Sequence, residues 1–349
     1  MNTTVTPLLS ADRVTKRYPA PSSSRPWSRQ HLVALSDFSL ELHAGQTVGI
    51  VGESGCGKST AARLLLDLET TSAGSILFDG KDVQRLSRSE RRRFRATVQP
   101  VFQNPWSALN PRLRIGQSIE EPLLVNSTMS KVERRARADE VLETVGIPSN
   151  RRSSFPHEFS GGQRQRIVLA RALALEPAVL ILDEPMSSLD VSIRAQMRDL
   201  ISDLRGRMEL SYLIISHDLA DVSRLADSLI VMYRGRVVEK GPTMEVLRSP
   251  SHPYTYGLVN LAMNRPFHGR DSLLGGRVPS PMVHVSGCDF QSRCVHRHEI
   301  CEHDVPKLIP TTSEVVEVAC HLNAGVGLTQ SERLPHEMPP EVAEGETPW

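Results

Sequence analysis

The chain has 349 residues and a formal net charge of +1 at pH 7, so it can hold one large domain plus a smaller one, and no overall field favours nucleic acid. Its longest apolar runs have the length of a strand, well short of the ~20 residues that a membrane span requires. Residues 1–4 offer neither a basic nor an apolar signal region, and we expect a cytoplasmic chain that reaches a membrane only through a partner.

Residues 10–50 have the pattern of strands, with a Ser/Pro/Arg-rich insert at 19–30. Residues 47–51 are an apolar run that predicts a buried parallel strand, and a helix is expected from near Lys58. The pattern G-x-x-x-x-G-K-[ST] follows the strand and extends into the start of the helix. It is formed by Gly52, Glu53, Ser54, Gly55, Cys56, Gly57, Lys58 and Ser59, and Thr60 follows it.

This loop has the chemistry of a phosphate cradle. Its glycines let the backbone bend so that successive N–H groups point at phosphate oxygens, and the helix presents its positive dipole end to the same anion. We expect Lys58 to reach the β- and γ-phosphates and the Ser59 hydroxyl to ligate Mg²⁺. A coincidental glycine-rich turn is the alternative, and the strand before it and the helix after it argue against that reading.

The middle of the chain reads as a hairpin followed by helices. The turn is expected at residues 79–82, and an Arg-rich helix follows at 85–95. That helix is interpreted as a solvated face because Glu90 interrupts the basic run and no aromatic residues alternate with it. Residues 104–160 are expected to be helical, with an amphipathic helix at 131–145.

Two further motifs point to nucleotide chemistry. A glycine-containing turn, made of Ser160, Gly161, Gly162 and Gln163, opens a helical pattern whose first amides can face a γ-phosphate. The apolar run 178–182 predicts a buried strand that ends in Asp183 and Glu184. Asp183 is placed to hold Mg²⁺ through water and Glu184 to act as general base on the attacking water; the alternative is two acids that cap the next helix.

Past another hairpin turn at 233–236, residues 265–287 read as a linker and residues after about 323 as a disordered tail. Between them lie Cys288, Cys294, Cys301 and Cys320, spaced C-x5-C-x6-C-x18-C. Disulfides are not expected in the cytoplasm, so a metal site is the first hypothesis. The spacing lacks the paired C-x2-C of structural zinc, although nearby histidines keep zinc open beside an iron–sulfur cluster and reduced thiols.

From about residue 10 to 325 these motifs resemble the ATP-binding subunits of ABC transporters. The resemblance implies an α/β fold: a P-loop NTPase core with an antiparallel β subdomain, a helical signature subdomain and a small Cys-rich C-terminal extension. The implied boundaries are 10–264 for the ATPase domain, 265–287 for the linker, 288–322 for the extension and 323–349 for the tail. In that family the phosphate loop and the 160–163 signature come from opposite subunits, so that each ATP lies between two chains.

The resemblance also implies residue roles. Gln103 matches the glutamine that senses Mg²⁺ and the γ-phosphate, Asp190 lies in the loop that communicates across the dimer, and His217 matches the histidine that contacts the γ-phosphate. Tyr18 is the best candidate for the aromatic that stacks on adenine. Taken alone, each has an ordinary reading, such as a solvated glutamine or an N-cap aspartate at 190. Phe159 stands where the commonest family form has leucine, which keeps a large apolar residue there.

The segment from 281 to 321, together with residues 252–255, resembles the oligopeptide/dipeptide/nickel branch, in which a [4Fe-4S] cluster on the four cysteines is implied. We therefore expect an ATP-hydrolysing subunit of a peptide importer at the cytoplasmic face of the inner membrane. Its implied partners are a second, paralogous ATPase, two transmembrane permease subunits and, indirectly, a substrate-binding protein, but no nucleic acid.

Three alternatives remain: an importer of nickel or another small solute, a redox sensor with the ATPase as its output, and a non-transport ATPase that acts on DNA or ribosomes. The last is disfavoured because only about 100 residues, without heptads, separate Lys58 from Ser160 and because the chain has one ATPase domain.

Overall fold

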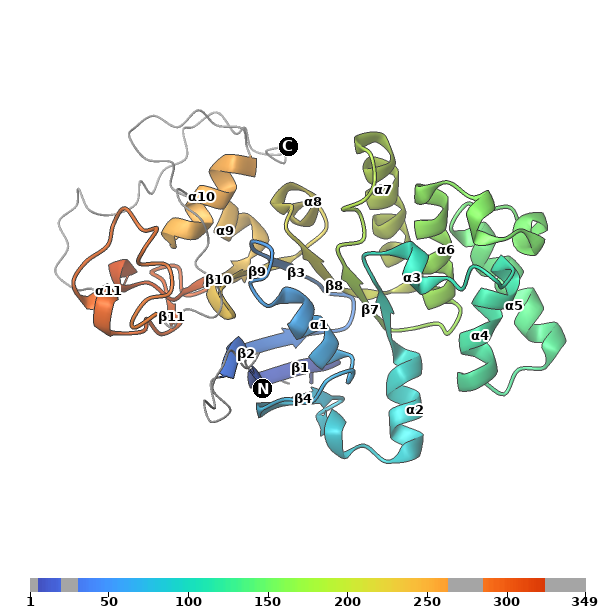
Figure 1. The fold of residues 1–349 in the computed structure, drawn as a ribbon, viewed down its shortest axis with the longest axis horizontal. Helices are drawn as coiled ribbons and strands as arrows, with labels where there is room; N and C mark the ends of the chain where they lie inside the picture. The colour runs from blue at the N-terminus through green and yellow to red at the C-terminus, as the bar shows by residue number, and fades with distance from the viewer. Residues whose placement is uncertain (1–5, 20–30, 263–284, 324–349) are drawn as a thin grey trace, which may run out of the picture.

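The computed structural model describes residues 6–19, 31–262 and 285–323. Within these residues the strands form two sheets, and helices cover both faces of the larger one (Figure 1). Residues 20–30 of the expected insert, residues 265–284 of the expected linker and residues 324–349 of the expected tail lie outside the described part, so the interpretations of those segments stay predictions.

The larger sheet has the strand order β11-β12-β10-β9-β3-β8-β7-β6. Five of its strands, β9-β3-β8-β7-β6, run parallel, and β10 pairs antiparallel to β9, which confirms the parallel strand at 47–51 and the hairpin turn at 233–236. The bounds are β3 (Thr47–Val51), β6 (Val98–Val101), β7 (Val179–Asp183), β8 (Ser211–Ser216), β9 (Ser228–Tyr233), β10 (Arg236–Pro242), β11 (Ile309–Pro310) and β12 (Glu317–Val318).

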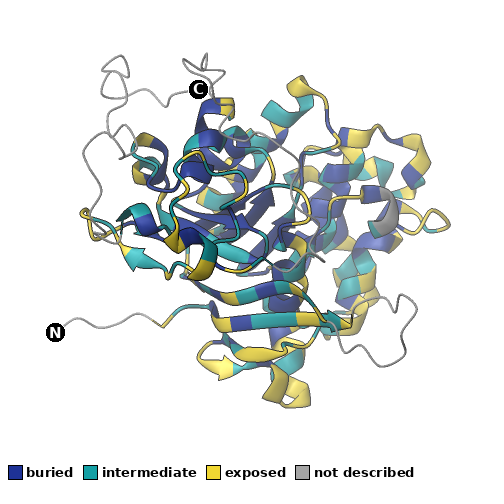
Figure 2. Cartoon of the chain, turned by 60° about the vertical axis from the view of Figure 1, so that its left-hand side comes forward, coloured by how far each residue is buried: buried dark blue, intermediate teal, exposed yellow. Residues whose placement is uncertain are grey.

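The central strands are buried on both faces because their side chains alternate between two apolar clusters. On β7, Val179 and Ile181 pack on the side of the smaller sheet, whereas Leu180 and Leu182 pack on the opposite side with the helices. Figure 2 shows the same distribution, with dark blue buried residues concentrated along these strands. Burial of both faces explains why these strands read as continuous apolar runs.

The smaller sheet is antiparallel and has the order β2-β1-β4-β5. Its strands are β1 (Leu9–Pro19), β2 (His31–Leu42), β4 (Ala73–Phe78) and β5 (Lys81–Asp82), and the turn between the last two confirms the expected hairpin at 79–82. Helix α1 (Lys58–Leu65) packs between this sheet and the large one, and its apolar residues belong to the shared cluster (Figure 1).

The helical region between β6 and β7 confirms the expectation for residues 104–160. Its elements are α3 (Pro105–Ala108), α4 (Ile115–Asn126), α5 (Lys131–Thr144) and α6 (Gly161–Leu173). The Arg-rich helix α2 (Arg88–Thr97) begins later than expected, because Ser87 caps it in a capping box with Glu90 and Arg85 ends a separate short 3-10 helix. Its arginines are mostly exposed, as a solvated face requires.

The remaining helices are α7 (Val191–Met208), α8 (Leu219–Ser223), α9 (Thr243–Arg248), α10 (Pro253–Ala262) and α11 (Ile300–His303). The cysteine segment, residues 285–323, joins the main fold directly. Its strand β12 pairs with β10 through Val318 and Glu239, and Phe290 and Val316 are buried in the main apolar cluster. The cysteine segment therefore shares the core of the large sheet.

Candidate functional site: the phosphate loop and its surroundings

The loop between β3 and α1 is shaped by glycines that no other residue could replace without movement. Gly57 has φ 107°, and a Cβ there would lie 2.4 Å from the carbonyl oxygen of Ala34. Gly52 is equally confined, since its Cβ would lie 2.2 Å from the carbonyl oxygen of Met232. The loop thus threads between β2 and β9 with its backbone in contact with both, which fixes its curvature.

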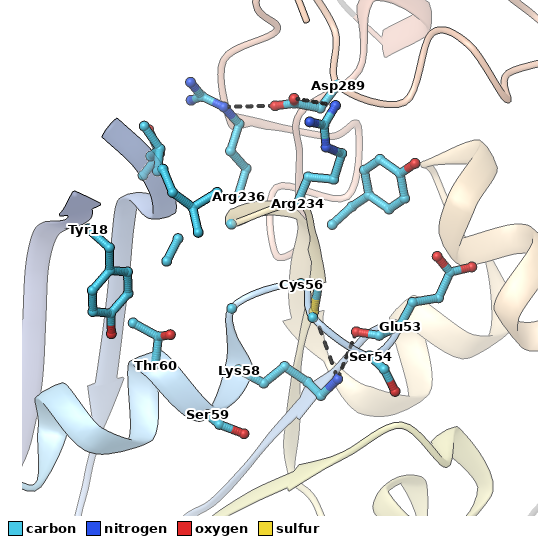
Figure 3. Close-up of a pocket in the computed structure, with 18 of the residues that line it drawn as sticks. Tyr18, Glu53, Ser54, Cys56, Lys58, Ser59, Thr60, Arg234, Arg236 and Asp289 are labelled. Carbon is cyan, nitrogen blue, oxygen red and sulfur yellow. Dashed lines mark hydrogen bonds and ion pairs between the residues drawn. The ribbon is translucent and has the colours of Figure 1, made fainter. Parts of the chain in front are cut away.

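The residues that open α1 lie where the sequence predicts them. Lys58 is 5% exposed, and its Nζ donates to the carbonyl oxygens of Gly52 at 2.6 Å and Glu53 at 3.0 Å, so that the ammonium sits inside the loop (Figure 3). The Ser59 hydroxyl donates to Asp183 Oδ1 at 3.4 Å. Burial raises the pKa of Asp183, and the Ser59 hydrogen bond opposes that shift. A hydroxyl and a half-buried carboxylate side by side form a donor set that suits Mg²⁺.

Glu184 is held between the two other residues expected to act in hydrolysis. Gln103 Nε2 donates to its Oε2 at 2.9 Å, and His217 Nδ1 lies 3.1 Å from its Oε1. The backbone of Glu184 has φ 50°, and its N–H donates to the carbonyl oxygen of Ile215 at 2.8 Å, which anchors it between β7 and β8. Three side chains from three different strand ends therefore meet at one carboxylate. Gln103 contacts this carboxylate and Ser187, whereas Ser59 and Asp183, which are also expected Mg²⁺ ligands, contact each other.

The signature residues lie away from this cluster. Ser160 caps α6 in a capping box with Gln163, and Gly161 and Gly162 are its first two helical residues. The helix therefore opens with the serine and glycines as expected, and no separate turn precedes it. None of residues 160–163 lines the cavity beside the phosphate loop. Asp190 caps α7, with its carboxylate accepting from the backbone N–H of Ile193 at 3.0 Å, and this hydrogen bond lowers the pKa of Asp190.

A cavity of about 1180 Å³ opens along the phosphate loop, a volume that suits a nucleotide-sized ligand. Tyr18 lines it from β1, with its hydroxyl on Glu69 and the Lys16 ammonium 5.0 Å from its ring centroid. The opposite wall includes residues that the sequence did not single out: Arg234, Gly235, Arg236, Gly287, Asp289 and Val305. Figure 3 shows Asp289 between the two arginines, on the far side of the loop from Tyr18.

The four C-terminal cysteines converge. Cys288, Cys294, Cys301 and Cys320 line one small cavity, together with His252, His296 and His321. Burial raises the pKa of the Cys288 thiol to about 11 and that of Cys294 to about 12. In the part of the chain that the structure describes, no group of three or more His, Cys, Asp or Glu side chains is arranged to hold a single metal ion.

Two contacts from the C-terminal region reach the phosphate loop and were missed by sequence reasoning. The Arg293 guanidinium forms two hydrogen bonds with the Glu53 carboxylate, at 2.8 and 2.9 Å. The Tyr254 hydroxyl accepts from the backbone N–H of Glu53 at 2.9 Å. Their partners are 240 and 201 residues away along the chain, and no local pattern connects them; the adjacency of Arg293 to Cys294 is the only sequence signal.

Comparison with known proteins gives a consistent result. The profile of the ABC transporter family matches residues 35–187, and that of the oligopeptide/dipeptide transporter C-terminal region matches residues 238–301. The chain is 44% identical over 290 residues to the di/tripeptide transport ATP-binding protein DppF of Pseudomonas aeruginosa, covering 82% of this chain and 89% of the relative. Against the dipeptide transport ATP-binding protein DppF of Escherichia coli, identity is 43% over 305 residues, with 86% and 91% covered.

Solved structures agree on the fold. The ATP-binding cassette MJ0796, dimeric in a post-hydrolysis state bound to ADP and Pi, superposes with a TM-score of 0.59 at 27% identity, covering 67% of this chain and 98% of that one. The cbiO1 protein of Clostridium perfringens, part of the transporter complex cbiONQ, gives 0.60 at 28% identity, with 74% and 97% covered. Among the described residues, no helix is long and apolar enough to cross a membrane.

Proposed function

The chain belongs to the ATP-binding subunits of ABC transporters, in the branch that imports peptides, and from this premise we propose how its residues share the work. It is an ATPase that powers peptide import. The relatives are named for peptide, dipeptide and tripeptide transport, so nickel import and a non-transport ATPase are not favoured. The observation that carries the proposal for the site is the meeting of Gln103 and His217 at Glu184, beside the phosphate loop.

In the proposed mechanism the loop amides of residues 52–60 other than that of Glu53 bind the phosphates, and Lys58 moves from the loop carbonyls to the β- and γ-phosphate oxygens. Ser59 and Asp183 would hold Mg²⁺, which supplies charge neutralisation of the phosphates. Glu184 takes a proton from the attacking water at a carboxylate oxygen. Gln103 and His217, each bonded to one oxygen of that carboxylate, orient it, and Tyr18 stacks on the adenine.

We propose that the second half of the site comes from another chain. The signature residues 160–163 lie outside the cavity of their own chain, which supports a sandwich in which they cap the partner's ATP. The similar cassette MJ0796 is dimeric with ADP and Pi bound, which supports the association of two ATPase chains. Asp190, as the cap of α7, lies in the loop expected to face across this dimer. The partner is proposed to be a paralogous ATPase, and the dimer drives two permease subunits at the cytoplasmic face of the inner membrane, supplied by a substrate-binding protein.

The remaining assignments follow the same premise. We keep the ATPase domain at 10–264, the linker at 265–287, the Cys-rich extension at 288–322 and the tail at 323–349. The helical region around α4, α5 and α6 serves as the signature subdomain that receives the permeases. Exposed apolar side chains on its surface, Leu124, Val125 and Val132, support that role.

The test of the ATPase proposal is hydrolysis by the purified chain with Glu184→Gln beside it. We expect the variant to lose phosphate release by about a hundredfold or more, since a general base contributes about 10²–10⁴-fold, while it still binds ATP. Asp203→Asn is the matched control. This carboxylate on α7 forms an ion pair with Arg207 of the same helix, away from the phosphate loop in the sequence, and the variant should hydrolyse ATP like the unmodified chain. Equal rates in Glu184→Gln and the unmodified chain would remove Glu184 from the mechanism.

We also propose that the four cysteines hold a [4Fe-4S] cluster, which would fasten the segment 285–323. Their convergence on one cavity supports four-thiolate ligation. Zinc on the same thiolates, with Zn–S bonds of about 2.3 Å, stays the alternative. Because burial raises the thiol pKa values, loading must release protons.

The test is the iron, acid-labile sulfide and zinc content of protein purified without oxygen, with Cys301→Ser alongside. Stoichiometric iron and sulfide that disappear in the variant support the cluster. Zinc in place of iron would favour the zinc alternative, and neither metal would leave reduced thiols. In all three cases the ATPase assignment stands on separate residues.

A further inference from the structure

The cysteine segment contacts the phosphate loop through a buried ion pair. Arg293 is only 4% exposed, and both of its terminal nitrogens bond the Glu53 carboxylate, which is 24% exposed. The guanidinium also lies 5.7 Å from the Tyr233 ring centroid and 5.8 Å from that of Phe290. A two-point contact on a guanidinium that is packed among aromatic rings fixes the direction of Glu53 as well as its charge.

A second contact holds the same loop residue by its backbone. The Tyr254 hydroxyl accepts from the N–H of Glu53 at 2.9 Å, and its ring packs on Tyr233 and Phe290 with centroid separations of 4.9 and 5.6 Å. Helix α10 and the cysteine segment therefore both bond to Glu53, one at its backbone and the other at its side chain. This N–H is directed at tyrosine, which leaves phosphate binding to the other amides of the loop.

The segment also helps to form the wall of the ATP cavity. Asp289, next to Cys288, accepts from Arg236 Nε at 3.1 Å and lies 3.6 Å from Arg234 Nη1 (Figure 3). All three residues line the cavity along the phosphate loop. The two residues that connect the segment to the ATP site, Asp289 and Arg293, thus directly adjoin the first two cysteines in the chain.

The charge on Glu53 makes the Arg293 contact consequential. A carboxylate in a loop that binds a polyanion repels the ligand unless a cation is close to it, and the repulsion is strong where water is excluded. Arg293 is the cation in contact with both oxygens of Glu53. Its removal would leave an exposed negative charge beside the phosphates and free the loop residue to rotate.

We propose that Arg293 is a positioning residue of the ATP site, which neutralises and orients Glu53 so that the cysteine segment completes the phosphate loop. The inference rests on the ATP-binding role proposed above. It assigns the segment a part in nucleotide affinity, and it makes the fold of the four-cysteine region a condition for full ATP binding. A tether that merely fastens the segment to the core would leave affinity unchanged once the protein is folded.

The experiment is a titration of the purified full chain with a fluorescent N-methylanthraniloyl derivative of ATP, in the presence of Mg²⁺. Arg293→Gln is expected to weaken binding about tenfold, which corresponds to about 1.4 kcal/mol. Glu53→Gln added to Arg293→Gln removes the charge that Arg293 compensates. The double variant should therefore bind the nucleotide with an affinity within about threefold of that of the unmodified protein. Glu53→Gln alone should bind more tightly, because it leaves Arg293 without a carboxylate partner near the phosphates.

Arg297→Gln is the matched control. Arg297 lies in the same segment, but its carboxylate partner is Glu302 of that segment and not a residue of the phosphate loop. The Arg297→Gln variant should therefore bind ATP like the unmodified chain. Arg293→Lys keeps the charge without the two-point contact and should give an intermediate affinity. This variant tests the same inference if Arg293→Gln does not fold. Metal content and thermal unfolding are measured on every variant, so that loss of the segment is recognised.

Unchanged affinity in a folded Arg293→Gln protein would overturn the inference. So would a double variant as weak as Arg293→Gln, because repulsion by Glu53 would then not be the cause. If the unmodified protein itself failed to bind the nucleotide, the ATPase proposal would fall, and that outcome is distinct from either of these.

Discussion

The two glycines at the start of α6 are predicted to respond differently to the same substitution. At Gly162 an added Cβ would lie 2.5 Å from Ile193 Cγ2 on α7, a distance that real Cβ contacts do not show. At Gly161 an added Cβ meets no atom within 4 Å in the chain. Gly162→Ala therefore overpacks the contact between α6 and α7, whereas Gly161→Ala changes only the surface that the proposed dimer would cover.

The magnitude follows from two opposing terms. Overpacking of a well-packed contact costs about 1–3 kcal/mol, and replacement of glycine by alanine in a helix returns up to about 1 kcal/mol. We expect Gly162→Ala to lose about 1–2 kcal/mol of unfolding free energy, which lowers the melting temperature by about 2–6 °C in a domain of this size. Gly161→Ala should keep or slightly raise the stability of the single chain.

The assay is urea unfolding of both variants, followed by ATP-driven dimerisation and hydrolysis in the presence of the proposed paralogous ATPase. Ile193→Ala makes room for the new methyl group, so its cost should be smaller in the Gly162→Ala background than in the unmodified chain. Gly161→Ala should impair dimerisation and hydrolysis despite its normal stability. Equal stability losses for the two glycine variants, or no coupling between positions 162 and 193, would refute the packing argument.

Two further predictions concern a buried carboxylate and the adenine wall. Burial raises the pKa of Glu239 to about 7 against backbone N–H donors at Ser251 and His252, so its contribution to stability is full below pH 4.5 and is lost as pH rises through 7. Between pH 4.5 and pH 7, the unmodified chain should lose about 3 kcal/mol more unfolding free energy than Glu239→Gln, as measured by urea unfolding at each pH. An equal loss in the two proteins would contradict this. Tyr18→Ala should weaken ATP binding by at least about fivefold, since stacking on an aromatic ring contributes about 1–3 kcal/mol per base, and Tyr18→Phe should not. Equal affinities of the alanine and phenylalanine variants in the same nucleotide titration would remove Tyr18 from the adenine site.

The strands, the hairpins and the phosphate loop were predictable because each depends on neighbouring residues. A buried parallel strand needs a continuous apolar run, and the loop needs glycines at fixed spacing, and both signals lie within residues 47–60. Helix boundaries depend on local signals that overlap. Glycines at 161–162 also suggested a turn, but the capping box of Ser160 and Gln163 lets the helix begin with them, as expected. The Arg-rich helix was predicted to begin at residue 85, which is too early, because the residue that caps it is Ser87.

The sequence by itself predicted that this chain binds ATP, through the loop at 52–60, and that it resembles the oligopeptide/dipeptide/nickel branch, through the order of its motifs and its cysteines. Only the tertiary structure decided which polar side chains meet. Gln103 and Glu184 are 81 residues apart in the chain, and Arg293 and Glu53 are 240 apart. Such pairs depend on the path of the whole backbone, which the residues next to them do not determine.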